Sequence, residues 1–418
     1  MLRTDEENNI ILDQGLTRVP KAVRARIVRD GKIVGTSTTP SLSSGSGASV
    51  EDLIHRARDS LFEEELFHEI MLETRNLISL DVKVRESTVH VPVPPCDALS
   101  LSSGDSGNHE VLIDLAPLDG SVVLQSDQQP HATADYIAVA LRLMLSHTHR
   151  QRLHRRSQIP PPLSDQKRRN SPPSILRPVL NHLQHHTATN SIRRYASNTA
   201  SVLRSAGLAF DTDMETELKL STLVDSSRSH MASSSPSSTT NDLITTLTGP
   251  LLTIATLSLP SSNTNKTQPE SLRISITTRL SPPTFGTEYT LTLPFALSSL
   301  LFSTDALPSS GSKRLTFTSF GELTSYLDFL LSVDVAHNII VAENEGWRGV
   351  EGEAEVLRTV EVEEARRTRK VGLQLGEGRM VVYWRWMDQL EKHGEVSWDG
   401  RRNGDVKGLR EVLKEFIT

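Results

Sequence analysis

The sequence predicts an α+β protein, in which an amphipathic helical region precedes a C-terminal antiparallel sheet with packed helices. In the first half, apolar residues recur at three- and four-residue steps, as over 49–79, which is typical of helices. After residue 241 the pattern changes to period two, as over 272–276 and 289–293, which is typical of half-buried strands. Strands that come in pairs, with helices between and after them, favour α+β over a parallel βαβ array.

The domain organisation follows from the length and from one linker. At roughly 100–200 residues per domain, 418 residues allow two to four domains. Residues 221–240 contain nine serines in twenty positions and too little apolar surface to offset chain entropy. We predict a partly ordered N-terminal segment (1–48), a mainly helical central region (49–220), a flexible, disordered Ser-rich linker (221–240) and a C-terminal α+β domain (241–418).

The N-terminal elements begin with a hairpin. Asp30-Gly31 lies between short β-prone runs, and such a pair tolerates the positive φ of a tight turn. A long amphipathic helix is predicted near 49–79, and short strands over 82–93 and 111–115. The apolar face assigned to that helix contains Val50, Leu53, Ile54, Ala57, Leu61, Leu66, Phe67, Ile70, Leu77 and Ile78.

Three further helices are predicted in the central region. The first runs from about Thr133 to Ser157, carries arginines near its C-terminal end and stops before three prolines at 160–162. Two shorter helices follow, Ser174 to about His186 and Asn190 to Ala206, and Gly207 is the expected C-cap.

The C-terminal elements alternate in type. After the strands over 272–276 and 289–293, a strand near Leu315 precedes Ser319–Glu322, which has the spacing of a capping box and starts a helix. Strands over 371–375 and 380–386 are joined through Gly376–Gly378, and a last helix is predicted near 406–417. Trp384 and Trp386 alternate onto one strand face, where burial in a core or interface is the default.

The chemical inventory indicates no catalytic, cofactor or metal site. A single cysteine, Cys96, excludes a disulfide framework and a multi-Cys metal site. Two histidine groups, at 147–154 and 182–186, lie among arginines without acidic or cysteine ligands nearby, which disfavours a metal. No run of 18 consecutive apolar residues exists, so no membrane span is expected. An interaction subunit therefore ranks above an enzyme.

The segment 150–169 leaves an alternative open. It carries seven Lys or Arg residues and one Asp, so it fits a nuclear localisation element or a nucleic-acid patch. A solvated helix end followed by a loop explains the same charges, and no aromatic residue is present for base stacking. An unrelated nuclear adaptor that binds nucleic acid through this segment is thus the second hypothesis.

Two stretches of the sequence resemble a known family. The first is LFEEELFHEI at 61–70. The second begins with ALRLMLSHTHR at 140–150 and continues through RRSQIPPPL at 155–163 to ILRPVL at 175–180. Together they resemble the fungal form of Mediator subunit 17, a head-module subunit of the RNA polymerase II Mediator complex. The resemblance is good over 20–210 and looser beyond, and the family's longer N-terminal helical region is expected to be missing here.

This resemblance implies a non-enzymatic scaffold in the nucleus, without cofactor, that helps to bridge transcription activators and RNA polymerase II. The implied partners are other head subunits (6, 8, 11 and 22) and RNA polymerase II through the assembled complex, with no membrane and no direct DNA binding. The residues expected to contact partners are Phe62, Leu66, Phe67, Arg155, Arg156 and Leu163. We expect Leu66 and Phe67 on a buried helix face.

Overall fold

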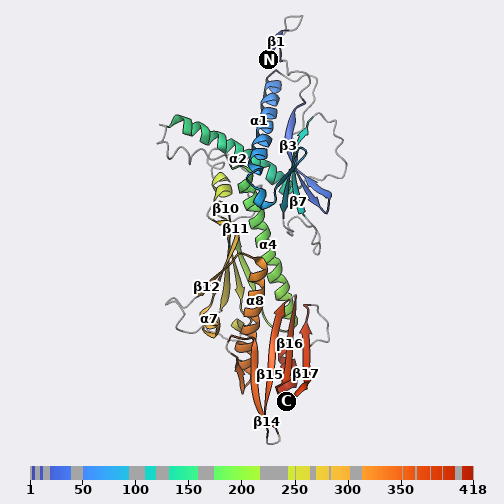
Figure 1. The fold of residues 1–418 in the computed structure, drawn as a ribbon, viewed down its shortest axis with the longest axis vertical. Helices are drawn as coiled ribbons and strands as arrows, with labels where there is room; N and C mark the ends of the chain where they lie inside the picture. Colours follow the sequence, from blue (N-terminus) through green and yellow to red (C-terminus); the bar gives the residue numbers. More distant parts are fainter. Residues whose placement is uncertain are drawn as a thin grey trace. The chain divides into compact units, whose positions relative to one another are not determined.

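A computed structural model of the chain describes residues 2–4, 10–12, 19–38, 50–93, 109–118, 131–158, 174–216, 243–249, 251–263, 270–281, 284–301, 313–350, 352–362, 365–376, 378–387, 389–400 and 407–417. The predicted linker at 221–240, the proline run, Cys96 and Leu163 lie outside these ranges. The chain forms two compact units, 1–187 with 218–249 and 188–217 with 250–418. Figure 1 shows the fold. None of the described helices is long and apolar enough to cross a membrane.

Unit 1 contains a five-stranded antiparallel sheet in the order β4-β3-β7-β6-β5. Asp30 and Gly31 both have positive φ, at 48° and 77°, so the predicted hairpin is confirmed. The strands of this sheet are β3 (Lys21–Arg29), β4 (Lys32–Thr36), β5 (Lys83–Arg85), β6 (Thr88–Val93) and β7 (His109–Pro117); β1 (Leu2–Thr4) pairs separately with β2 (Ile10–Leu12).

Two long helices, α1 (Val50–Thr74) and α2 (Ala132–Ser157), contact β3, the strand beside the edge strand β4. A short 3-10 helix, Ile78–Leu80, follows α1. The apolar residues assigned to one face of α1 divide between two sides. Val50 and Leu61 are 68% and 59% exposed, whereas Leu66 is fully buried. At about 100° per residue, Leu61 and Leu66 lie about 140° apart around the helix, so a single stripe cannot hold both.

The third helix, α4 (Leu176–Ser205), is continuous, so the expectation of two shorter helices is wrong. Thr187, inside the expected break, bonds its hydroxyl to the carbonyl of Leu183 at 2.9 Å and leaves the helix intact. The predicted C-cap at Gly207 is confirmed. Its φ is +78°, and the Leu208 N–H reaches the Leu203 carbonyl at 2.9 Å. Residues 176–187 of α4 belong to unit 1, and the rest belongs to unit 2.

Unit 2 contains two five-stranded antiparallel sheets, in the orders β12-β11-β10-β9-β8 and β13-β14-β15-β16-β17. The first is built from β8 (Thr212–Thr216), β9 (Leu251–Ser258), β10 (Ser271–Ser281), β11 (Thr284–Leu293) and β12 (Lys313–Phe317). The second is built from β13 (Trp347–Gly349), β14 (Glu355–Val362), β15 (Ala365–Gly376), β16 (Arg379–Trp386) and β17 (Gln389–Trp398). The helices are α7 (Phe295–Leu301), α8 (Phe320–Asp334), a π-helical continuation (Val335–Val341) and α9 (Leu409–Ile417).

The core of unit 2 joins both sheets with α8 and the end of α4. Leu323, Leu327, Leu330 and Leu331 of α8 are buried. The side-chain half of the predicted capping box is wrong. Ser319 occupies the N-cap position, but its side chain makes no capping hydrogen bond. The helix starts instead on backbone geometry, since the Leu323 N–H reaches the Ser319 carbonyl at 3.2 Å.

These helices and antiparallel sheets confirm the predicted α+β class. The central region predicted as mainly helical also contributes β5, β6 and β7. The chain passes from one compact unit to the other at 217/218, at 249/250 and, inside α4, at 187/188. Because α4 is one unbroken helix, no change of composition marks this division in the sequence.

Two glycines in the second sheet of unit 2 make room for aromatic side chains on the neighbouring strand. Trp384 is paired with Gly394 across β16 and β17, and a Cβ built on Gly394 would lie within van der Waals overlap of the indole, at 2.1 Å. Tyr383 covers Gly372 in the same way, at 2.2 Å. The two tryptophans expected to be buried, Trp384 and Trp386, are only half-buried, while Trp398 is 2% exposed.

We expect Gly394→Val to lower the free energy of unfolding by about 1–3 kcal/mol, because the indole of Trp384 cannot move away without losing its contacts. Urea titration followed by tryptophan fluorescence measures this change. Ser397→Val, at an exposed position of the same strand, is the control and should change stability by less than about 0.5 kcal/mol. Equal effects of the two substitutions would contradict the packing role of Gly394.

Candidate functional site

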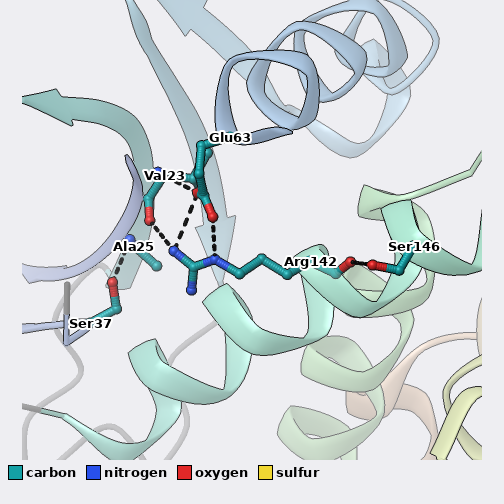
Figure 2. A network of polar contacts seen from close by, with 6 residues as sticks. All are labelled: Val23, Ala25, Ser37, Glu63, Arg142 and Ser146. Atoms are coloured by element: carbon teal, nitrogen blue, oxygen red, sulfur yellow. Dashed lines mark hydrogen bonds and ion pairs between the residues drawn. The ribbon is translucent and has the colours of Figure 1, made fainter. Parts of the chain in front are cut away.

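The polar centre of unit 1 is an ion pair between α1 and α2 above β3. Glu63 and Arg142 have side chains only 10% and 24% exposed, and Arg142 Nε lies 2.6 Å from Glu63 Oε1. Both groups also hold the backbone of Val23: its N–H donates to Glu63 Oε2 at 2.7 Å, and its carbonyl accepts from Arg142 Nη2 at 3.0 Å (Figure 2). One carboxylate and one guanidinium therefore join two helices to β3.

Further along the same two helices, α1 and α2 are joined by a second set of charges. His149 Nε2 lies 2.8 Å from Glu65 Oε1, and Arg152 Nη2 lies 2.8 Å from Glu69 Oε1. His149, Glu65 and Arg152 are 35%, 43% and 39% exposed, so each pair has at least one well-solvated partner and contributes little to stability, roughly 0–1 kcal/mol. Arg152, one of the arginines of the basic segment 150–169, is therefore paired with a glutamate of α1.

A third contact joins α1 to the start of α4. The carboxylate of Glu73, which is 5% exposed, accepts the N–H groups of Ile175 at 2.7 Å, Leu176 at 2.7 Å and Arg177 at 3.1 Å. The hydroxyl of Ser174 donates to the same carboxylate at 3.1 Å. The first N–H groups of a helix have no partner within it and carry a partial positive charge. Glu73 thus caps α4 from about one hundred residues away in sequence.

These contacts bring together the segments that carry the family resemblance. Glu63, Glu65 and Glu69 belong to the stretch at 61–70, and Arg142 and His149 belong to the stretch at 140–150. The stretch at 175–180 starts at the N–H groups bound by Glu73, one turn beyond the first stretch. The acidic side chains of α1 and the basic side chains of α2 therefore pair with each other within this chain.

The residues expected to contact partners differ in how exposed their side chains are. Leu66 is fully buried, as expected, but it belongs to the core of unit 1 and offers no surface, because it shares a helix face with Glu63 and Ile70. Phe62 and Phe67 are half-buried, and Phe62 meets the His149 ring edge-on at 6.2 Å. Arg155 and Arg156 are exposed at the end of α2. Leu163 is outside the described residues.

Glu63, Glu73 and Arg142 join the helices of unit 1, but none of them is among the functional residues that the sequence analysis proposed. A signal for the two glutamates is present in their spacing: Glu63, Leu66, Ile70 and Glu73 follow steps of three, four and three, which place them on one helix face. Carboxylates on an apolar stripe of this kind require buried partners, because a buried charge without a partner is costly. The sequence does not say which residues those partners are.

The histidine groups do not form a metal centre in the part of the chain described here, where no group of three or more potential ligands occurs. His182 and His185 are 5% and 9% exposed. Burial is the largest cause that lowers their pKa values, and that of His185 falls to about 4. Both rings are therefore neutral at pH 7, and His182 lies near Tyr136 with ring centroids 6.4 Å apart.

The contacts above hold the chain's own helices and strands together. Residues 1–203 match the family described as Subunit 17 of Mediator complex, so the predicted resemblance is confirmed.

Curated fungal relatives agree with this assignment. The chain is 33% identical over 301 residues to Mediator of RNA polymerase II transcription subunit 17 of Emericella nidulans, covering 70% of this chain and 42% of the relative. It is 35% identical over 216 residues to the Aspergillus oryzae protein of the same name, covering 50% and 32%. The chain thus spans less than half the length of these relatives. A chain in the structure of the Schizosaccharomyces pombe Mediator head module aligns with 78% of this chain and 63% of its own length, with 13% identity and a TM-score of 0.47.

Proposed function

We propose that this chain is a non-enzymatic scaffold subunit of the Mediator coactivator complex and acts in the nucleus. The observation that carries the proposal is the match of residues 1–203 to the subunit 17 family, supported by relatives that bear that name. The scaffold role fits the architecture of unit 1, in which Glu63, Arg142 and Glu73 join three helices and a sheet.

The proposed partners are other Mediator head subunits, among them subunits 6, 8, 11 and 22. Through the assembled complex the chain would help to bridge transcription activators and RNA polymerase II. A surface for a partner helix is available on α1, where Val50, Ile54 and Leu61 are 68%, 39% and 59% exposed and lie within about 40° of one another around the helix. Exposed apolar side chains on one helix face favour docking of another apolar helix face.

This function is tested by purifying the tagged full chain from nuclear extract and identifying bound proteins by mass spectrometry. We expect other Mediator subunits with the wild-type chain. We expect several-fold less of them with Ile54→Glu/Leu61→Glu, because each change places a charge on the proposed contact face. Val139→Glu is the matched control, since Val139 is 53% exposed on α2 and away from that face.

Circular dichroism should show the same helix content in all three chains, because the altered side chains are exposed. Recovery of no Mediator subunit with the wild-type chain would falsify the proposed function. Equal recovery with the α1 variant would leave the scaffold function standing and move the contact away from α1.

A further inference from the structure

His131 joins the start of α2 to the edge strand β4 in unit 1. Its backbone N–H donates to the carbonyl of Thr36 at 3.1 Å. Its side chain lies against Gly35, where an added Cβ would lie only 2.4 Å from the Cβ of His131. In the described sheet β4 pairs only with β3, so its other edge is available for such a bond. The first residues of α2 are thus fixed to the end of β4.

The side chain of His131 is also the N-cap of α2. The residue has extended backbone angles, φ −123° and ψ 122°, and its Nδ1 accepts the N–H of Thr133 at 3.2 Å. The first N–H groups of a helix have no partner within it, and a side chain at the N-cap position supplies one. Because the donor is a backbone N–H, Nδ1 must be the ring nitrogen without a proton. This hydrogen bond therefore exists only while the imidazole is neutral.

The surroundings of His131 favour the neutral ring. Burial is the largest cause that lowers the pKa of His131 below its ordinary value of 6.5. Asp135, one turn along α2, opposes this effect and raises the pKa, whereas Arg29 of β3 lowers it. The partial positive charge at the N-terminus of a helix also disfavours an imidazolium. From β4 the contact receives Gly35 and Thr36, neither of which titrates.

The lowered pKa sets the direction of the pH dependence. In the unfolded chain the imidazole takes up a proton near pH 6.5, whereas the folded chain resists that proton. The cap therefore contributes its full stability above about pH 6.5 and loses it as the pH falls through the lowered pKa of the folded chain.

We propose that His131 is a proton-sensitive cap, which fixes the first turn of α2 to β4 when the imidazole is neutral and releases that turn when the imidazole is protonated. The release is confined to the start of the helix, because Arg142, three turns further along α2, keeps its ion pair with Glu63. This conformational device belongs to unit 1 alone and goes beyond the proposed scaffold function, on which it does not rest.

The test is amide hydrogen exchange of the full chain at pH 7 and pH 5, corrected for the intrinsic exchange rate at each pH. Ordinary aspartates and glutamates, with pKa values of about 3.9 and 4.3, stay charged over this range. We expect the protection of the Thr133 N–H to fall about two- to thirtyfold from pH 7 to pH 5, as for the loss of a helix N-cap. Protection of the Val23 N–H, which Glu63 accepts, should stay constant.

Four variants make the outcome specific. His131→Asn places an amide oxygen where Nδ1 lies, and Asn is a good N-cap that does not titrate, so Thr133 should be equally protected at both pH values. His131→Ala should lose this protection at both. Asp135→Asn removes the carboxylate that favours the imidazolium, so the loss should move to lower pH. His154→Asn is the control, because it removes an exposed histidine near the other end of α2 and should keep the wild-type pH dependence.

Unchanged protection of Thr133 in the wild-type chain between pH 7 and pH 5 overturns the proposal. So does an equal pH dependence of the wild-type chain and His131→Asn, because a different group would then be responsible. If His131→Ala unfolds, the comparison of wild type with His131→Asn decides the question. None of these measurements involves a Mediator subunit, so their outcome is separate from that of the proposed function.

Discussion

Replacing Glu63 with Ala is expected to lower the local free energy of unfolding of unit 1 by about 3–5 kcal/mol. The substitution leaves the guanidinium of Arg142 largely buried without its carboxylate and leaves the buried N–H of Val23 without an acceptor. The amide of Val23 reports the effect directly. Its hydrogen exchange should accelerate by about two to four orders of magnitude, since every 1.4 kcal/mol is a factor of ten.

Glu65→Ala is the matched control, because Glu65 lies on the same helix and also faces α2, but its side chain is 43% exposed. The cost there should stay below about 1 kcal/mol. Glu63→Leu/Arg142→Met removes both charges together and should recover only part of the loss, since both backbone groups of Val23 remain without partners. If Glu63→Ala costs no more than Glu65→Ala, the ion pair does not hold α1 and α2 to β3.

Periodicity carries the prediction of the fold where an element has one clear buried face. The alternation of Leu272, Ile274 and Ile276 predicts β10, and all three side chains are buried in the core. Strand β17 shows why other elements escape prediction. Its sequence QLEKHGEVSW is polar and contains Gly394, and it is stabilised by pairing with β16 and by the Trp384 indole over that glycine.

Helix α4 illustrates the opposite error. Thr187, Thr189 and Asn190 favour helix ends by local propensity, which predicts a break. The side chains of Thr187 and Thr189 are buried in the folded chain, and tertiary packing outweighs the small local preference. Propensities of a few tenths of a kcal/mol per residue cannot oppose the burial of a 30-residue helix.

The site is less predictable than the fold because its contacts join distant parts of the chain. The sequence identifies 61–70 and 140–150 as segments that resemble one family, but it does not show that Glu63 contacts Arg142, which lies 79 positions further along the chain. In unit 2, the pairing of Trp347 with Arg358, of Arg358 with Arg369 and of Arg369 with Trp386 likewise depends on the registers of three strand pairs at once. A one-residue slip in any of these pairs moves every side chain of the slipped strand to the other face, so composition alone cannot predict these neighbours.

Glu73→Ala is expected to lower the stability of the start of α4 by about 3 kcal/mol. A side-chain cap on a helix N-terminus contributes about 0.5–2 kcal/mol, and a buried N–H left without a partner costs about 1–3 kcal/mol more. Glu73 accepts three backbone N–H groups and one hydroxyl, so its loss affects the whole first turn. The amides of Ile175, Leu176 and Arg177 should therefore lose hydrogen-exchange protection together.

Glu69→Ala is the control for that experiment, since Glu69 lies one turn earlier on α1 and pairs with the more exposed Arg152. Its cost should stay below about 1 kcal/mol, without any change at Ile175–Arg177. Glu73→Gln keeps the shape and one acceptor oxygen but removes the charge that favours a helix N-terminus, so it should fall between wild type and Glu73→Ala. Unchanged protection of the three amides in Glu73→Ala would mean that α4 starts independently of α1. The segment at 175–180 would then owe its place in unit 1 to apolar packing of Ile175 and Leu176, which are 0% and 1% exposed.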